Sequence, residues 1–165
     1  EKEIKDLNLL TIKPILYILN VDEQEAEKTS ADDKTIFISA KIESEIAEFS
    51  QEEATNYLKE LGLSQSGLDR LITASYKLLN LITFFTTGPK ETRAWTVESG
   101  AKAPEAAGKI HTDFERGFIR AEVINWQDLI ACGSENQAKE KGLIRLEGKD
   151  YIVCDGDAML FRFSV

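Results

Sequence analysis

The chain has 165 residues, of which 42% are hydrophobic and 30% are charged, and its formal net charge is −9. This composition is typical of a folded globular protein of one or two domains, and no apolar run approaches the ~20 residues that a membrane span needs. Residues 1–82 carry 9 Lys and Arg against 16 Asp and Glu, whereas residues 83–165 carry 11 against 13. An acidic chain is not suited to nonspecific nucleic-acid binding, so any RNA contact requires a local basic patch in the second half.

Cysteine and histidine usage limits the chemistry of the chain. Cys132 and Cys154 lie far apart without paired spacing, and His111 is the only histidine. We therefore expect two free thiols in a reducing cytoplasm and no metal site. The first three residues have neither the basic start nor the apolar core of a signal peptide. Because the chain also lacks an initiator Met, we expect it to be a piece of a longer protein.

Two short apolar runs, Ile15–Leu19 and Thr35–Ile38, predict strands that are buried on both faces, as in a parallel α/β sheet. Residues 1–10 predict the last turns of a preceding helix, and Asp32-Asp33 predicts a turn before the second strand. Each strand ends in polar residues, at the edge where open α/β sheets bind their ligands.

Two helices are predicted after these strands. Residues 42–49 read as a loop or a short helical turn, and Ser50 with Glu53 forms a capping box that opens a helix to about Leu61. Residues 64–81 predict a second helix, whose apolar residues recur at the helical spacing of a core-facing stripe.

The second half of the sequence predicts a small mixed sheet around one main helix, a β-grasp arrangement. A hairpin turns at Gly88-Pro89. The predicted strands are 82–86, 92–97, 118–124, 143–146, 151–153 and 159–163, and the predicted helices are 105–108, 110–116, 126–131 and 135–141.

Five stretches of the sequence carry a family resemblance that runs almost from end to end. They read LNLLTIKPILYILNVDE, FISAKIESEIAEF, SGLDRLITASYKLLNLITFFTTGPKETRAWTV, GAKAPEAAGKIHTDFERGFIRAEVI and RLEGKDYIVCDGDAMLFRFSV. They resemble the C-terminal part of the YchF subfamily of Obg-related P-loop NTPases, also called Obg-like ATPases. The resemblance implies an α/β fold in which the C-terminal part of a P-loop NTPase (G-domain) parallel sheet precedes an α+β β-grasp TGS domain. It implies three segments: residues 1–10 end a coiled-coil insertion, 11–82 end the nucleotide-binding domain, and 83–165 form the TGS domain.

The resemblance also implies the base-recognition half of a nucleotide site. The residues concerned follow the two predicted strands: Asn20, Val21, Glu23, Ser39, Ala40 and Lys41. Guanine-specific family members read Asn-Lys-x-Asp at the first motif, where the Asp carboxylate accepts two guanine N–H groups. Here Val and Glu replace the Lys and Asp, which weakens guanine recognition and fits the ATP preference that the resemblance implies. Without the resemblance, the first motif reads as a strand-end turn with acidic solvent contacts, and Ser39-Ala40-Lys41 reads as a capped strand end.

No G-x-x-x-x-G-K-[ST] motif and no D-x-x-G switch occurs in the sequence. Binding of the phosphates and Mg²⁺ depends on the first motif. We therefore expect no catalytic residue and no bound cofactor in this fragment. The full-length parent is expected to be an ATP- or GTP-hydrolysing enzyme that uses Mg²⁺, and the fragment alone is expected to be inactive.

The resemblance implies that residues 83–165 contact RNA or the ribosome, in particular its large subunit. The candidate residues are cations, namely Lys90, Arg93, Lys109, His111, Arg116 and Arg120, with Phe114 or Phe118 as an exposed aromatic partner. The alternative is that the aromatic residues belong to the core and the cations are solvated. A second function also stays open, in which the chain acts as a stand-alone TGS-type RNA- or protein-binding module without nucleotide function. In either case we expect a monomer without membrane association.

Overall fold

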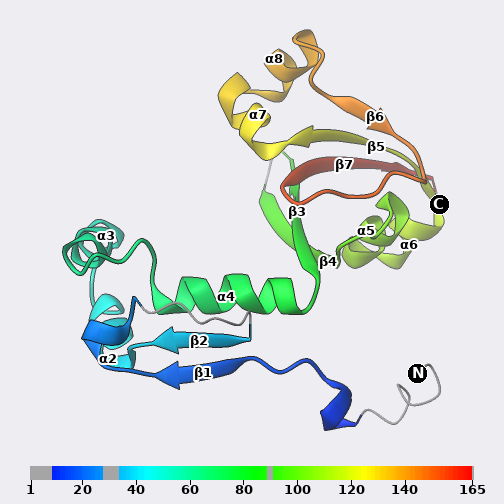
Figure 1. Ribbon diagram of the computed structural model, residues 1–165. Coiled ribbons are helices and arrows are strands. Elements are labelled where there is room, and N and C mark those ends of the chain that lie inside the picture. Colours follow the sequence, from blue (N-terminus) through cyan, green and yellow to red (C-terminus); the bar gives the residue numbers. More distant parts are fainter. Residues whose placement is uncertain (1–8, 28–33, 89–90, 165) are drawn as a thin grey trace. The chain divides into compact units, whose positions relative to one another are not determined.

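The structure is a computed structural model that describes residues 9–27, 34–88 and 91–164 (Figure 1). The chain forms two compact units, Glu1–Leu79 and Asn80–Val165. Most of the helix expected over residues 1–10, together with the turns expected at Asp32-Asp33 and after Gly88, lies outside the described residues. None of the helices in the described ranges is long and apolar enough to cross a membrane.

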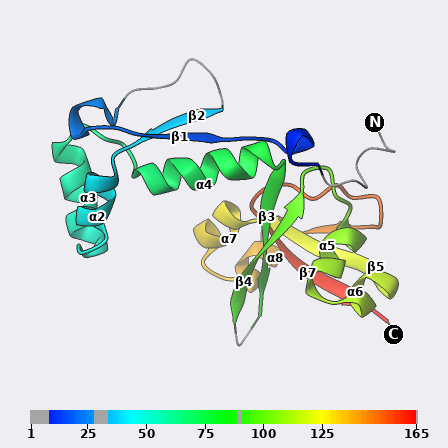
Figure 2. The same cartoon turned by 90° about the horizontal axis from the view of Figure 1, so that it is seen from below.

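The first unit contains a parallel pair of strands, β1 (Tyr17–Asn20) and β2 (Thr35–Ile38). The strand expected at residues 15–19 therefore starts and ends slightly later, whereas the second strand is confirmed. The backbone N–H of Val21 donates to the carbonyl of Ile38 at 2.9 Å and extends the ladder past the end of β1. Both strands point toward the same helix, α2 (Figures 1 and 2), so their carboxyl ends meet at one edge.

Helical elements make up most of the rest of this unit. They are two 3₁₀ turns, Leu10–Ile12 and Glu23–Glu25, and the α-helices α2 (Ala40–Ile46), α3 (Gln51–Glu60) and α4 (Gly67–Leu78). The capping box at the start of α3 is confirmed, because Ser50 and Glu53 bond each other reciprocally. Residues 42–49 were expected to form a loop or a short helical turn, and the helical alternative is confirmed as far as Ile46, where α2 ends. The Glu43 carboxylate of α2 accepts the N–H groups of Gly67 and Leu68 at 2.7 and 3.2 Å, a tertiary contact that local sequence does not reveal.

The prediction that both strands are buried on two faces is also wrong for the described part of this unit. All four residues of β1 are exposed, whereas β2 is largely half-buried. The reason is geometric: β1 pairs with β2 along one side, and α4 packs against β2. The apolar stripe of α4 is likewise incompletely covered, since Leu68 and Ile72 are about half exposed.

The second unit is built on a five-stranded mixed sheet. Its strands are β3 (Leu81–Thr87), β4 (Thr92–Glu98), β5 (Phe118–Asn125), β6 (Arg145–Glu147) and β7 (Asp157–Phe163). The spatial order is β4-β3-β7-β5-β6, with β3 and β7 parallel and the other pairs antiparallel. The helices are α5 (Ala103–Ile110), α6 (Thr112–Arg116), α7 (Trp126–Cys132) and α8 (Glu135–Glu140).

Helices cover parts of both faces of this sheet. On one face, three alanines of α5 join Phe84, Met159 and Phe161 in the larger core. On the other face, Cys132 and Ala138 of α7 and α8 pack with Ile124 and Ala158 in a smaller core. Phe118 is buried in the larger core and Phe114 packs against it, stacked on Phe163. The prediction that Phe118 is an exposed aromatic partner for RNA is therefore wrong.

The strand expected at residues 151–153 is reduced to one isolated bridge between Ile152 and Lys102. Side-chain hydrogen bonds order this segment instead. The buried Asp157 carboxylate accepts the Tyr151 hydroxyl at 2.7 Å and the N–H of Cys154 at 2.9 Å. Burial raises the pKa of Tyr151, and the neighbouring Asp157 carboxylate raises this pKa further.

The second unit is expected to fold alone, because both of its cores draw only on its own residues. Residues 80–165 expressed alone should unfold cooperatively on heating. Residues 83–165 should be less stable, because this shorter segment lacks the start of β3, including Ile82, which packs on the larger core. Calorimetry of both segments is the measurement. A broad, non-cooperative transition for residues 80–165 would contradict an independent domain.

Candidate functional site

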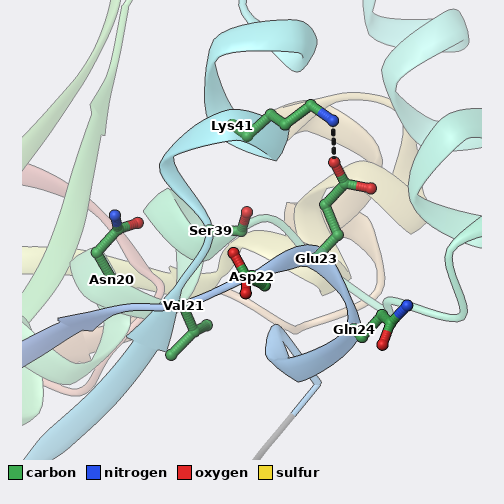
Figure 3. Close-up of a pocket in the computed structure, with 7 residues that line it drawn as sticks. All are labelled: Asn20, Val21, Asp22, Glu23, Gln24, Ser39 and Lys41. Carbon is green, nitrogen blue, oxygen red and sulfur yellow. Dashed lines mark ion pairs between the residues drawn. The ribbon is translucent and has the colours of Figure 1, made fainter.

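The polar ends of β1 and β2 line an open cavity of about 450 Å³ (Figure 3). The loop after β1 contributes residues 20–24, and the residues after β2 contribute Ser39 and Lys41. Because the strands are parallel and in register, segments that are about twenty positions apart in sequence meet at one sheet edge. The structure thus brings five of the six expected base-site residues to one cavity, and Ala40 lies next to it in the chain.

Asn20 connects the two segments. Its side-chain Oδ1 accepts the backbone N–H of Ala40 at 3.0 Å. This bond joins the end of β1 to the first residue of α2, and it engages the Ala40 N–H within the protein. Ser39, between β2 and α2, is buried, with only 3% of its surface exposed. The edge is therefore held in place on the β2 side, while the loop after β1 remains more exposed.

Glu23 and Lys41 face each other across the cavity and form an ion pair (Figure 3). The hydrogen bond to Glu23 raises the pKa of Lys41, and the charges of Glu23 and Glu45 raise it further. The Glu23 side chain is 37% exposed and the Lys41 side chain is 68% exposed. Exposed pairs of this kind are weak and are screened by salt, so a ligand that enters the cavity can compete for either partner.

The cavity is lined by both hydrogen-bond donors and hydrogen-bond acceptors. Carboxylates of Asp22 and Glu23 accept, the Lys41 ammonium donates, and the Asn20 and Gln24 amides do both. Such an edge can recognise the polar rim of a planar base. In the described ranges, no group of three or more His, Cys, Asp or Glu side chains is arranged to hold a metal ion.

Two lining residues, Asp22 and Gln24, were not among the expected site residues. Their signal was their position inside the same polar loop as Asn20 and Glu23. Glu43 does not line this cavity, and its carboxylate instead holds the N-terminus of α4. That role depends on a contact between residues 24 positions apart, so periodicity and motifs do not indicate it.

The expected RNA-binding cations are distributed over separate parts of the second unit. Lys109 and Arg116 lie in the last turns of α5 and α6. His111 lies between these helices, where its Nδ1 accepts the N–H of Asp113 at 3.2 Å, a capping role. Arg93 of β4 stacks over the Trp95 ring at 4.5 Å. The remaining two candidates are Arg120, which lies on β5, and Lys90, which is outside the described residues.

Comparison with known proteins identifies relatives of both units. The family model YchF-GTPase_C, described as "Protein of unknown function (DUF933)", matches residues 81–164. The ribosome-binding ATPase YchF of Bacillus subtilis is 52% identical over 100% of this chain and 49% of its own length. The ribosome-binding ATPase YchF of Haemophilus influenzae is 55% identical over 98% of this chain and 48% of its own length.

A solved structure agrees with these relatives. The structure of the Schizosaccharomyces pombe YchF GTPase matches with a TM-score of 0.82 and 35% identity, over 98% of this chain and 46% of the other. The mixed α/β architecture, with one parallel and one mixed sheet, is thus that of a YchF structure. The chain spans about half the length of the curated relatives that it matches.

Proposed function

This chain belongs to the YchF family, and from that premise we propose that it supplies the base-recognition edge of an ATPase together with an RNA-binding module. In this proposal residues 11–82 are the C-terminal part of a nucleotide-binding G domain, and residues 1–10 end a coiled-coil insertion. Residues 83–165 are a TGS domain of the β-grasp type. The strand order β4-β3-β7-β5-β6, with its parallel central pair, supports the β-grasp assignment.

The observation that carries the nucleotide proposal is the cavity at the ends of β1 and β2. Parallel α/β sheets bind ligands at this edge, and the cavity is lined by Asn20, Val21, Glu23, Ser39 and Lys41. Asn20 braces the edge through its bond to Ala40. The Val21 carbonyl is the acceptor proposed for the adenine amino group, since its N–H is already bonded to Ile38.

The ion pair at the same edge supports the proposed preference for ATP over GTP. Guanine presents N1–H and a 2-amino group, which a carboxylate accepts well, whereas adenine presents neither to a carboxylate. Glu23 is tied to Lys41, so its carboxylate is partly occupied. The phosphates and Mg²⁺ are proposed to bind parts of the full-length protein outside this chain, which contains no P-loop motif.

Ribosome or RNA binding is proposed for the second unit. The support is the name of the relatives, ribosome-binding ATPases, and the near balance of 11 cations and 13 anions in residues 83–165. The large ribosomal subunit is the partner proposed, and the setting is the cytoplasm. In this proposal the nucleotide-binding unit and the ribosome-binding unit are linked in one chain.

The test of the nucleotide proposal is an Asn20→Ala substitution in the full-length protein that contains this chain. Removing the amide breaks the bond to Ala40 and a base contact, so ATP affinity should fall about tenfold or more. Asn56→Ala is the matched control, because Asn56 is exposed on α3, away from the cavity-lining residues. Calorimetric titration with ATP measures both variants. Equal affinities in the two variants would remove this edge from the nucleotide site.

A further inference from the structure

A β-bulge in β5 places Phe118 and Arg120 on opposite faces of the sheet. Phe118 pairs with Phe163 and Arg120 pairs with Arg162, so Ile119 is an extra residue with no partner on β7. Without the bulge, Phe118 and Arg120 would share a face, because side chains two apart in a strand point the same way. The bulge allows Phe118 to enter the larger core while Arg120 stays exposed.

Arg120 lies on the face opposite to α5 and α6. Along β5, Glu122 and Ile124 continue the Arg120 side, and Ile124 belongs to the smaller core beneath α7 and α8. Ala121 and Val123 point the other way into the larger core. The face that α7 and α8 cover at one end therefore carries Arg120 and Arg162 at its other end.

Two arginines directly opposite each other on neighbouring strands repel, which destabilises a sheet. One carboxylate offsets part of this repulsion. Glu122 accepts Arg162 Nη2 at 2.9 Å and Arg162 Nε at 3.1 Å, and it lies 3.4 Å from Lys139 Nζ of α8. These two cations lower the pKa of Glu122, which keeps it ionised. Within the described ranges, Arg120 has no carboxylate within ion-pair distance.

We infer that this end of the sheet, formed by Arg120, Arg162, Lys139 and Glu122 and here called the arginine face, binds RNA phosphates. The inference rests on the proposed RNA-binding function and deepens it, because it places the contact on the sheet rather than on α5 and α6. Two cations, Arg162 and Lys139, pair with the Glu122 carboxylate, and Arg120 lies opposite Arg162, so these four side chains carry an excess of positive charge on an overall acidic chain. Leu146 of β6, opposite Glu122, is exposed beside them.

Phosphate is the ligand that fits this arrangement best. A guanidinium group presents planar donors that match phosphate oxygens bidentately, and Glu122 already fixes the orientation of Arg162. None of the four residues of the arginine face is aromatic. The neighbouring rings of β7 are engaged elsewhere, because Phe161 lies in the larger core and Phe163 stacks on Phe114. Base stacking is therefore not offered here, and contacts to the backbone of a folded RNA are expected.

The experiment compares two single substitutions of exposed arginines in the whole 165-residue chain. Arg120→Gln removes one charge from the arginine face, and Arg116→Gln removes one charge from α6 as the matched control. The probe is a fluorescently labelled RNA hairpin, titrated at several salt concentrations. Arg120→Gln should weaken binding about threefold to tenfold, and it should lower the slope of log affinity against log salt by about 0.7 to 0.9. Arg116→Gln should change neither quantity.

The outcomes separate the two proposals. If the unchanged chain binds the hairpin but only Arg116→Gln weakens binding, the arginine face is wrong and RNA binding stands. If the unchanged chain does not bind the hairpin even at low salt, RNA binding by this chain is itself overturned. A polyglutamate competitor that displaces the RNA as well as unlabelled RNA does would also contradict phosphate recognition. Arg162→Lys, which retains the charge beside Glu122 but loses the bidentate fork, should weaken binding less than Arg120→Gln.

Discussion

Replacing Val21 by Lys and Glu23 by Asp together in the full-length protein is expected to move its nucleotide preference toward GTP and away from the ATP preference that we propose. Both residues line the cavity at the ends of β1 and β2. The shorter Asp carboxylate is placed to accept two guanine N–H groups, and the Lys stem is placed along the base. Hydrogen bonds to a charged group contribute about 1.5–3 kcal/mol each, so the ATP:GTP affinity ratio should fall by about tenfold to a hundredfold.

The ion pair between Glu23 and Lys41 contributes to this effect. The Glu side chain reaches Lys41 across the cavity, and a side chain one methylene shorter reaches it less well. The substitution therefore releases a carboxylate for guanine as well as repositioning it. Val21→Lys alone is the control, because it adds the charge without moving the carboxylate and should change ATP and GTP affinity equally.

Calorimetric titration of the parent, the single variant and the double variant with both nucleotides is the measurement. An unchanged ratio in the double variant would remove residues 20–23 from base selection. The fragment itself should bind ATP only at millimolar concentration, because a few base contacts of about 0.5–1.5 kcal/mol each barely offset an association cost of about 4 kcal/mol or more. Micromolar binding by the fragment would show that phosphate contacts lie within it.

Gly117→Ala is expected to destabilise the second unit by about 2 kcal/mol or more. Gly117 ends α6, and the N–H of Ser164 donates to its carbonyl at 2.9 Å. A Cβ at this position would lie 2.1 Å from the carbonyl oxygen of Ser164, and that oxygen belongs to backbone rather than to a flexible side chain. The chain after β7 must therefore move away from the start of β5, which disturbs the pairing of Phe118 with Phe163.

Urea unfolding followed by tryptophan fluorescence measures this effect in the second unit alone, because both tryptophans, Trp95 and Trp126, lie within it. Gly148→Ala is the matched control. A Cβ at Gly148 meets no atom within 4 Å, and its backbone is not in the left-handed region, so stability should change little. Equal unfolding midpoints for the two variants would show that the end of β7 is not held against Gly117.

The position of Arg120 could be predicted only in part from motif and composition. The sequence identified Arg120 as one of six candidate RNA-binding residues, together with Lys109 and Arg116. Strand alternation alone would have put Phe118 and Arg120 on the same side. The bulge at Ile119 reverses this relation. A bulge is set by how a strand pairs with its neighbour, and β7 lies about forty residues further along the chain.

The elements themselves were largely determined by local sequence. The capping box of Ser50 and Glu53, the apolar run of β2 and the hairpin strands β3 and β4 were predicted from residue type and spacing. The polar ends of β1 and β2 were also identified as one edge, because parallel strands bring their carboxyl ends together. Capping and periodicity act within a few residues, so they are readable without the fold.

Only the tertiary structure decided the contacts between distant segments. Three such contacts join residues that are 18 or more positions apart. They are the hydrogen bond from Ala40 to Asn20, the ion pair of Glu23 with Lys41, and the hydrogen bond from Gly67 at the start of α4 to Glu43. The ordering of residues 151–157 by the Asp157 carboxylate, in place of a strand, is a further case. These contacts depend on which side chains the strand pairing and helix packing bring within hydrogen-bond distance, and that distance is not encoded in any local pattern.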